Sequence, residues 1–291
     1  MSETAQGGRP LSVLEVIRKS SDFFAAKGIE SPRLNAELLV GQSLGLKRMQ
    51  LYLQFERVLA EPELAKIRQL VRRRGLGEPL QYVLGEAEFH GLKLKVDRRA
   101  LIPRPETEWM VHTVVERAGT AHPAAVLDLG TGTGAIALAL ATAWPGACVT
   151  AVDLSGEALA LATENAQALG LGTRVSLVQS DWFSQVPAEA RFDLVVANPP
   201  YLSAEETEKA PAEVREHEPA AALTAGDGGL ADLRHILKGA LRHLNPGGWI
   251  ALETGPGQHA ELRQIAGEYG WTRFESLRDL AGRDRCVLAW A

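Results

Sequence analysis

Beyond Ala124, short apolar runs alternate with longer amphipathic or apolar stretches, and this alternation restricts the fold more than any other feature of the sequence. The first runs lack the polar alternation of a half-exposed strand, as expected for strands covered on both faces. Strands separated by helices indicate a doubly wound, mainly parallel α/β sheet. We therefore predict a seven-stranded Rossmann-like sheet. Its strands are Val126–Leu129, Cys148–Asp153, Val175–Gln179, Leu194–Ala197, Trp249–Glu253, Trp271–Leu277 and Arg285–Trp290.

The connections between these runs predict helices and one change of strand direction. Four of the connections have helical length and pattern. They are Ala135–Ala143, Glu157–Leu169, Leu230–Leu244 and Gln258–Tyr269. The last two strands are joined by only a few residues, so we expect that pair to be antiparallel.

The first part of the chain has a different pattern and indicates a second domain. Apolar residues recur at helical spacing over residues 11–84, which predicts a small helical domain. Residues 85–110 alternate in polarity at their start and are predicted to form a hairpin connector. The sheet domain is expected to occupy residues 111–291. Residues 1–10 are polar and glycine-rich, so we expect a flexible tail there.

Composition excludes several classes of protein. The 291 residues carry a net charge of −5, which argues against a chain-wide basic surface for nucleic acid. The longest apolar stretch, Ala135–Trp144, is too short to span a bilayer, and no secretory signal is visible. Cys148 and Cys286 match no metal-binding spacing and are expected to be small core residues. We therefore expect a soluble cytoplasmic protein without a metal site.

A glycine-rich loop follows the first predicted strand and is the first candidate binding site. It reads Gly130-Thr131-Gly132-Thr133-Gly134, and a predicted helix begins at once. Glycines permit a tight turn and a close approach of backbone to ligand, and the helix start offers free N–H groups. The next strand ends in Asp153, about 20 positions later, where a carboxylate would accept hydrogen bonds from ribose hydroxyls. The loop reads G-x-G-x-G rather than G-x-G-x-x-G, so a nicotinamide dinucleotide and S-adenosylmethionine both remain possible at this point.

A second candidate site follows the fourth predicted strand and reads Asn198-Pro199-Pro200-Tyr201. The two prolines fix the backbone and remove two N–H donors, which leaves a surface rich in acceptors. The Asn198 side-chain oxygen and the Pro199 carbonyl would accept the two N–H groups of a target –NH₂, and Tyr201 would place an aromatic face beside it. Holding both hydrogens aims the nitrogen lone pair at a methyl donor. The pattern therefore favours methylation of an amide or amino nitrogen.

Asp181 and Trp182 follow the third predicted strand, at the same edge of the sheet. One interpretation is an adenine pocket, in which the carboxylate accepts from the exocyclic amine and the indole packs on the ring. The other is a core tryptophan at a strand end. We favour the first, because ligands bind at the carboxyl edge of such sheets.

Together these motifs resemble the class I S-adenosylmethionine methyltransferases that act on nitrogen. Further stretches narrow the resemblance to the PrmC/HemK type, the peptide chain release factor glutamine-N5 methyltransferases. These stretches are Ser31-Pro32-Arg33-Leu34-Asn35-Ala36-Glu37, Arg73-Arg74, Glu78-Pro79-Leu80-Gln81-Tyr82, Gly85, Phe89-His90-Gly91-Leu92, Ile102-Pro103-Arg104-Pro105-Glu106-Thr107-Glu108, Glu253-Thr254-Gly255-Pro256-Gly257-Gln258 and Asp279-Leu280-Ala281-Gly282-Arg283-Asp284-Arg285. The resemblance covers almost the whole chain from about Ser12.

This resemblance implies a substrate, a cofactor and roles for the candidate residues. The substrate would be the glutamine of the Gly-Gly-Gln motif in release factors, and the helical domain would recognise that partner. Residues 130–134 would line the methionine part of S-adenosylmethionine, Asp153 would hold its ribose and Trp182 would flank its adenine. Asn198, which also faces the cofactor, would act with Pro199 and Tyr201 in catalysis, and the four residues 198–201 would bind the glutamine. The segment 102–108 would lie near the transfer site, without individual roles.

Three alternatives to this function remain. A ribosomal-protein glutamine methyltransferase would share the Asn-Pro-Pro-Tyr motif, but usually reads Pro-Arg-Ser-Pro where this chain reads Pro-Arg-Pro-Glu-Thr-Glu. A DNA or RNA amino-group methyltransferase should have a more basic surface. A binding module without activity would not need Asn198 and Tyr201. We therefore expect no membrane partner and no direct nucleic-acid substrate. Ala220 stands where many relatives carry a larger or basic residue, which affects the expected substrate groove.

Overall fold

A computed structural model describes residues 10–291, so the tail predicted at residues 1–10 lies outside the described part except for Pro10. The described chain divides into two compact units, one ending at Leu84 and the other spanning Gly85–Ala291. Each unit has its own buried apolar clusters, and none of these clusters contains residues of both units. Each unit is therefore described separately.

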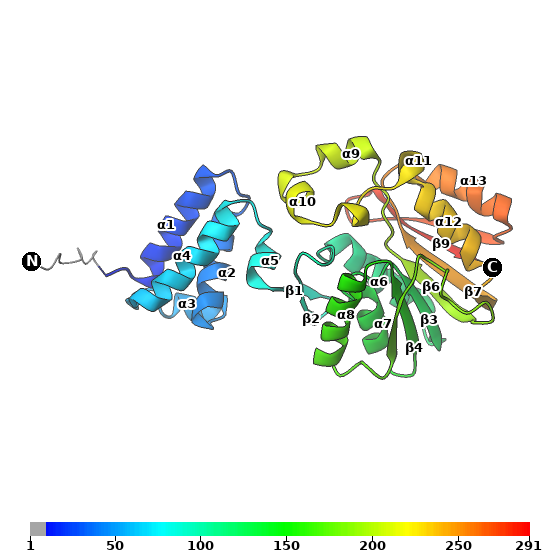
Figure 1. Ribbon diagram of the computed structural model, residues 1–291, viewed down its shortest axis with the longest axis horizontal. Helices are drawn as coiled ribbons and strands as arrows, with labels where there is room; N and C mark the ends of the chain where they lie inside the picture. The colour runs from blue at the N-terminus through cyan, green and yellow to red at the C-terminus, as the bar shows by residue number, and fades with distance from the viewer. Residues whose placement is uncertain (1–9) are drawn as a thin grey trace, which may run out of the picture. The chain divides into compact units, whose positions relative to one another are not determined.

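Over residues 10–84 the N-terminal unit is built from helices, as predicted (Figure 1). Its helices are α1 (Val13–Ala26), α2 (Pro32–Leu44), α3 (Arg48–Tyr52), α4 (Glu61–Gly75) and α5 (Leu80–Leu84). Ser12 and Glu15 form a capping box that satisfies free N–H groups at the start of α1. Ile17, Phe24 and Leu39 are buried in a single core, which holds α1 against α2.

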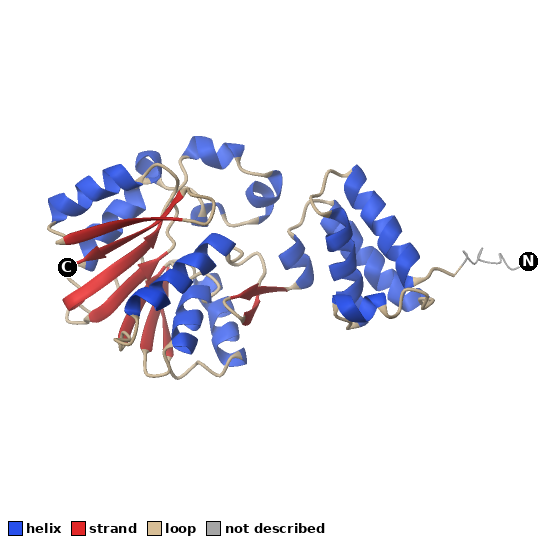
Figure 2. Cartoon of the chain, turned by 180° about the vertical axis from the view of Figure 1, so that it is seen from behind, coloured by secondary structure: helices blue, strands red, loops and turns tan. Residues whose placement is uncertain are grey.

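The second unit contains the predicted seven-stranded sheet (Figure 2). The strands are β3 (Ala125–Leu129), β4 (Cys148–Asp153), β5 (Val175–Gln179), β6 (Phe192–Ala197), β7 (Leu244–Glu253), β8 (Arg273–Arg278) and β9 (Asp284–Trp290). Their order is β5-β4-β3-β6-β7-β9-β8. The first five strands in this order are parallel, and β9 pairs antiparallel with both β7 and β8. The doubly wound fold and the antiparallel last pair are therefore confirmed.

Helices cover both faces of this sheet. They are α6 (Pro105–Ala118), α7 (Ala135–Ala143) and α8 (Gly156–Ala168) on one face, and α12 (Ala231–Ala240) and α13 (His259–Tyr269) on the other (Figure 1). Consecutive strand residues enter opposite cores: Val126 packs in the cluster that includes α6 and α7, whereas Leu127 packs with α12 and α13. Burial on both faces explains why these strands read as continuous apolar runs.

The hairpin β1 (Glu86–Phe89) and β2 (Leu92–Lys95) belongs to the sheet unit. Phe89 and Leu94 lie in the core beside α6, and the Lys95 backbone exchanges two hydrogen bonds with the Asn165 side chain of α8. The boundary expected at residue 111 falls inside α6, which begins at Pro105. Four short elements lie between β6 and α12: α9 (Ala204–Lys209), α10 (Ala212–His217), η1 (Ala220–Ala222) and α11 (Gly226–Gly229).

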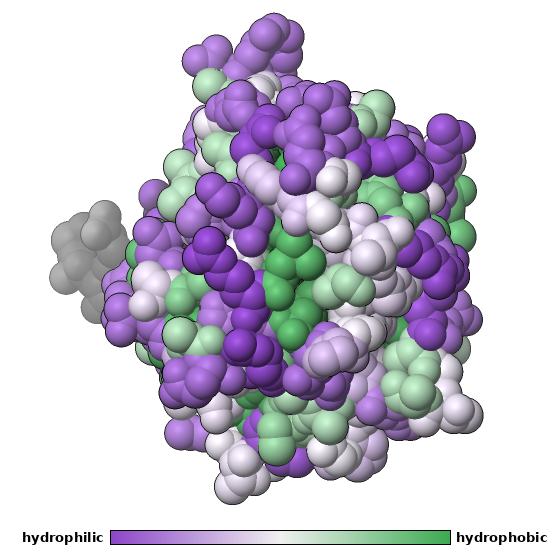
Figure 3. Space-filling model, turned by 90° about the vertical axis from the view of Figure 1, so that its right-hand side faces the viewer, coloured by the Kyte–Doolittle hydropathy of each residue, from purple (hydrophilic) through white to green (hydrophobic). Residues whose placement is uncertain are grey.

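The burial of the cysteines and the polarity of the surface test two expectations from composition. Cys286 is buried on β9, but the prediction that both cysteines are core residues is wrong for Cys148, which is exposed because β4 only begins there. On the face shown in Figure 3, hydrophilic residues predominate, the most continuous apolar area is a narrow central strip, and smaller apolar spots lie around it. Over residues 10–291, every helix is too short or too polar to cross a bilayer.

Candidate active site

A cavity of about 480 Å³ opens at the carboxyl ends of β3, β4, β5 and β6. β4 and β6 flank β3 on opposite sides, so the strand order reverses here, which is where ligands bind in open α/β sheets. Most of the predicted site residues lie on the cavity wall. They are Gly130, Thr131, Gly132, Thr133, Asp153, Asp181, Trp182, Asn198 and Pro200. Gly134, Pro199 and Tyr201 are not among the lining residues.

The glycine loop takes a conformation that L-residues rarely adopt. Gly130, Gly132 and Gly134 have φ of 72°, 55° and 83°. A Cβ on Gly134 would lie 3.1 Å from Leu138 and 3.3 Å from Ala162, so this glycine permits close packing of the helix that follows. A Cβ on Gly130 would lie 3.5 Å from the ring of Trp182, so this ring lies directly beside the loop. The first two glycines thus leave the cavity floor as bare backbone.

Asp128, at the end of β3, holds the glycine loop from below. Its Oδ2 accepts hydrogen bonds from Thr131 Oγ1 at 2.6 Å and from the Ala137 N–H at 3.2 Å. Complete burial raises the pKa of this carboxyl to about 7. Its Oδ1 is buried without a hydrogen-bond partner among the described residues. Our sequence reasoning gave Asp128 no role, although its position directly before the glycines was a usable signal.

Asp153, at the end of β4, is held rigidly beside the loop. Its Oδ2 accepts from the Gly132 N–H at 2.8 Å and its Oδ1 from the Ser155 N–H at 2.9 Å. Burial raises its pKa, and these backbone hydrogen bonds act in the opposite direction. An ionised carboxylate has about four lone-pair sites, so acceptor capacity remains for ligand hydroxyls.

Trp182 lines the cavity after β5, with its ring beside Gly130. It has a φ of 47°, which is unusual for a bulky residue, and its carbonyl accepts from Ser180 Oγ at 2.8 Å. Its side chain hydrogen-bonds to Asp232 on α12, whose pKa is raised mainly by burial. Asp232 also lines the cavity, and sequence reasoning missed it because it lies about 50 residues downstream with no motif around it.

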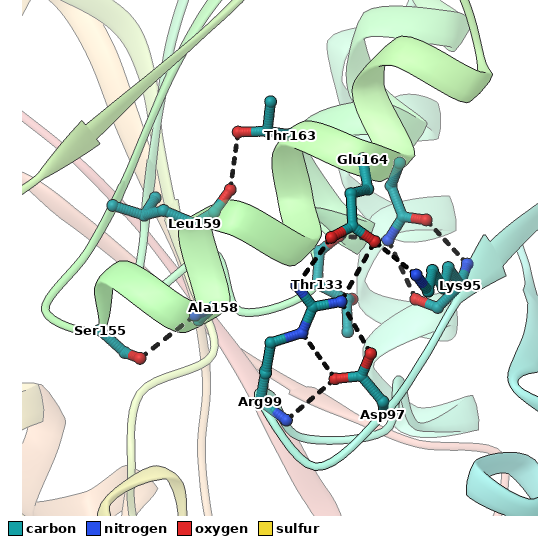
Figure 4. Close-up of polar contacts among 10 residues, drawn as sticks. Lys95, Asp97, Arg99, Thr133, Ser155, Ala158, Leu159, Thr163 and Glu164 are labelled. Carbon is teal, nitrogen blue, oxygen red and sulfur yellow. Dashed lines mark hydrogen bonds and ion pairs between the residues drawn. The ribbon is translucent and has the colours of Figure 1, made fainter.

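A salt-bridge cluster supports the wall beside α8 (Figure 4). Arg99 bonds to Asp97 through Nε at 2.8 Å and to Glu164 through Nη1 at 2.7 Å, and Lys95 Nζ lies 2.6 Å from Glu164. The hydrogen bond from Arg99 lowers the pKa of Glu164 to about 2. The neighbouring Asn165 donates to the Thr133 carbonyl at 2.9 Å, so the glycine loop is tied to α8 and the hairpin.

The segment after α10 forms another part of the cavity wall, and a buried carboxylate holds it in place. Glu218 is 6% exposed, accepts from the Ile102 N–H at 3.2 Å and pairs with Arg104. It thereby fixes the neighbouring Pro219 on the cavity wall. Ala220, which we expected to affect the substrate groove, is exposed and lies outside the cavity lining.

Asn198 follows β6 and joins a hydrogen-bond network that starts at the cavity wall, where Thr107 is also a lining residue, and continues to the buried Glu253. Its Nδ2 donates to Thr107 Oγ1 at 2.9 Å, and Thr107 Oγ1 donates to Glu253 Oε2 at 2.6 Å. Tyr201 donates its hydroxyl to Glu253 Oε1 at 3.0 Å, so this ring lies behind Asn198 rather than on the wall as expected. Burial raises the pKa of Glu253 to about 7 and also raises that of Tyr201. Thr107 and Glu253 stood in recognised stretches, but sequence reasoning gave them no role.

Sequence comparison identifies the family. Residues 15–85 match the PrmC N-terminal domain and residues 106–230 match the methyltransferase small domain. The release factor glutamine methyltransferase of Rhodopirellula baltica is 39% identical over 292 residues, covering 99% of this chain and 98% of that protein. That of Moorella thermoacetica is 44% identical, covering 91% and 94%. This chain belongs to the release factor glutamine methyltransferase family. The resemblance inferred from the motifs and the methyltransferase prediction are therefore confirmed.

Solved structures agree at the level of the fold. The catalytic domain of human Mettl16, solved with an RNA hairpin, is 18% identical with a TM-score of 0.56, covering 81% of this chain and 84% of that one. A Thermus thermophilus 16S rRNA N2 G1207 methyltransferase is 22% identical with a TM-score of 0.51, covering 70% of this chain and 49% of that one. At these identities the likeness concerns the Rossmann-like methyltransferase fold alone.

Proposed function

We propose that this protein transfers the methyl group of S-adenosylmethionine to N5 of the glutamine in the Gly-Gly-Gln motif of a peptide chain release factor. The observation that carries the proposal is the position of the Asn-Pro-Pro-Tyr turn. It follows β6 directly, and Asn198 and Pro200 share one cavity wall with the glycine loop of the adjacent β3. Family membership, at 39% identity over nearly the whole chain, supports the same reaction.

The cavity suits S-adenosylmethionine in size and in chemistry. Its volume of about 480 Å³ lies in the usual range for small-molecule sites. The backbone at Gly130 and Gly132 would admit the methionine portion, Asp153 would accept from the ribose hydroxyls, and Trp182 would cover the adenine. When bound, the sulfonium supplies an electrophilic methyl together with its own leaving group, so no protein nucleophile is needed. Neither cysteine nor histidine occurs among the described residues that line the cavity.

The remaining chemical task is to position a weak nucleophile. An amide nitrogen attacks poorly because its lone pair is delocalised into the carbonyl. We propose that Asn198 Oδ1 and the Pro199 carbonyl accept the two N–H groups of the substrate amide and aim its nitrogen at the methyl group. The same acceptors would stabilise the positive charge that develops on nitrogen during transfer. The reaction would then proceed by direct transfer, without a covalent enzyme intermediate.

The helical unit is proposed to recognise the release factor, and the protein to work in the cytoplasm, where such a partner acts. Support comes from the match of residues 15–85 to the PrmC N-terminal domain and from the separate core of this unit. A recognition unit with its own core can bind a protein surface without altering the cavity.

Peptide mapping tests the proposed reaction. Purified protein is incubated with unmethylated release factor and S-adenosylmethionine, and the digested product is examined by mass spectrometry. We expect one added methyl group on the glutamine of Gly-Gly-Gln. A protein that binds S-adenosylmethionine but leaves this glutamine unmodified would contradict the proposal, and ribosomal proteins would be the next substrates to assay.

A further inference from the structure

The carboxylate of Glu253 lies beside Asn198 because of the register between β6 and β7. Ala197 pairs with Leu252, so Asn198, the residue after β6, and Glu253, the last residue of β7, lie at the same edge of the sheet. Thr107, in the first turn of α6, lies between the two side chains and bonds to both. Glu253 is 1% exposed and Thr107 is 4% exposed, so water does not compete for these hydrogen bonds.

The donors and acceptors in this network allow one arrangement when Glu253 is ionised. A carboxylate only accepts, so the hydroxyls of Thr107 and Tyr201 must both donate to it. Thr107 has a single hydroxyl proton, which is then committed, so its oxygen can only accept from Asn198. The Asn198 amide must therefore turn Nδ2 toward Thr107, and Oδ1 lies at the opposite corner of the amide. If the amide were flipped, Asn198 Oδ1 would face Thr107 Oγ1, and two acceptors would lie together without a proton between them.

We propose that Glu253, acting through Thr107, is a positioning residue that fixes the Asn198 amide with its carbonyl oxygen toward the substrate amide. This inference rests on the proposed function, because it explains how Asn198 presents an acceptor rather than a donor to the glutamine –NH₂. An Asn198 amide turned by 180° would offer N–H groups to the N–H groups of the substrate. Neither Thr107 nor Glu253 needs to contact the substrate for this effect.

The protonation state of Glu253 decides which groups donate and which accept in the hydrogen bonds that join Glu253, Thr107 and Asn198. Besides its two hydroxyl donors, Glu253 experiences the positive charge of Arg285, which favours ionisation, and the negative charge of Glu106, which opposes it. Burial raises the pKa of the Cys286 thiol, and the negative charge of Glu253 raises it further. If Glu253 is protonated, its O–H can donate to Thr107, whose hydroxyl becomes free to donate to Asn198 Oδ1. The amide would then be stable in the reversed orientation.

A matched set of threonine variants tests the proposal. Thr107→Val keeps the shape of the side chain and removes the hydroxyl, Thr107→Ser restores the hydroxyl, and Thr113→Val makes the same change on α6, where the hydroxyl bonds only to the Trp109 carbonyl. The assay measures kcat and KM on intact unmethylated release factor, with the Kd of S-adenosylmethionine from calorimetry. Loss of one preorganised oxyanion-hole donor lowers kcat by about 10²- to 10³-fold in other enzymes. Thr107→Val would misorient an acceptor rather than remove it, so we expect kcat to fall at least about tenfold. Thr107→Ser and Thr113→Val should stay near wild type, and the Kd should be unchanged in all three.

A double-mutant cycle separates positioning from a structural effect. In an Asn198→Ala background there is no amide to orient, so Thr107→Val should cause no further loss of kcat. The same fractional loss in both backgrounds would overturn the proposal, as would wild-type kcat in Thr107→Val itself. If Thr107→Val loses cofactor binding, Glu253→Leu decides, because leucine cannot accept the Thr107 hydroxyl: it should lower kcat at constant Kd, and full kcat would refute the role. A wild-type protein inactive on release factor would instead count against the proposed function.

Discussion

Two adjacent glycines allow the position of the Asn-Pro-Pro-Tyr turn to be tested by one added methyl group. Gly229 is buried with a φ of 92°, and a Cβ there would lie 2.2 Å from the Tyr201 carbonyl oxygen and 2.9 Å from Gln258 Nε2. Gly228 is exposed with a φ of 62°, and a Cβ there would have no neighbour within 4 Å. The two alanine variants thus share a positive φ and differ in the clash with Tyr201.

The expected cost follows from this difference. Each alanine in a left-handed conformation costs about 1–2 kcal/mol. The Gly229→Ala methyl group must also displace backbone, and overpacking of this kind costs about 1–3 kcal/mol more. For a unit of about 200 residues, 1 kcal/mol lowers the Tm by roughly 2–4 °C. We therefore expect Gly229→Ala to melt roughly 2–12 °C below Gly228→Ala by scanning calorimetry.

The same clash should reach the reaction, because the displaced atom belongs to the turn that carries Asn198. The Tyr201 carbonyl is held by Gln258 Nε2 at 3.0 Å, and pushing it away shifts the turn at the cavity wall. Methyl transfer to release factor should fall at least about tenfold in Gly229→Ala, since small misplacements of positioning groups are costly. Gly228→Ala should remain near wild type. Equal Tm values together with equal kcat values in the two variants would refute the reasoning.

Three further predictions concern the cofactor, pH and the helical unit. Asp153→Asn should weaken S-adenosylmethionine binding about 10- to 100-fold by calorimetry, because hydrogen bonds to a charged group contribute about 1.5–3 kcal/mol; unchanged affinity would remove Asp153 from the site. The kcat should fall as pH drops below about 7, where Glu253 takes up a proton, and the Glu253→Gln variant should lack this step; retention of the step would assign it to another group, such as Asp128. Deleting residues 1–84 should abolish activity on intact release factor while S-adenosylmethionine still binds, and full activity would show that the helical unit is not needed for recognition.

The raised pKa of Glu253 also has a consequence for stability. Its ordinary pKa of 4.5 rises to about 7 in the folded protein, so between these values the folded state binds a proton that the unfolded state has released. Stability from this group is therefore present below pH 4.5 and is lost as the pH rises toward 7. An ionised, buried carboxylate at neutral pH is thus destabilising, which is a cost expected of a residue retained for function.

The strands could be predicted because each is covered on both faces and therefore reads as a continuous apolar run. Their limits were less predictable where tertiary contacts decide them. The run Trp249–Glu253 was recognised, but β7 begins earlier, at Leu244, because Leu244 pairs with Phe192 before an irregularity in the register. The expected helix Leu230–Leu244 accordingly ends at Ala240. A helical pattern of apolar residues that continues through the connection does not show at which residue the helix ends and the turn begins.

In the candidate site, too, residues marked by a local motif could be predicted, whereas residues brought together by long-range contacts could not. Asn198 could be assigned a role because its chemistry lies in four consecutive residues after a strand, and Asp153 because its spacing from the glycines is set by one β-α-β unit. Thr107 and Glu253 are 146 positions apart, and nothing local marks either as a partner of the other. They meet because α6 begins over the end of β7, while the parallel pairing of β6 and β7 places Asn198 and Glu253 at the same edge of the sheet. Short sequence motifs thus indicate which residues could contact a substrate. The orientation of the Asn198 amide, in contrast, depends on the register between two strands, which only the folded chain defines.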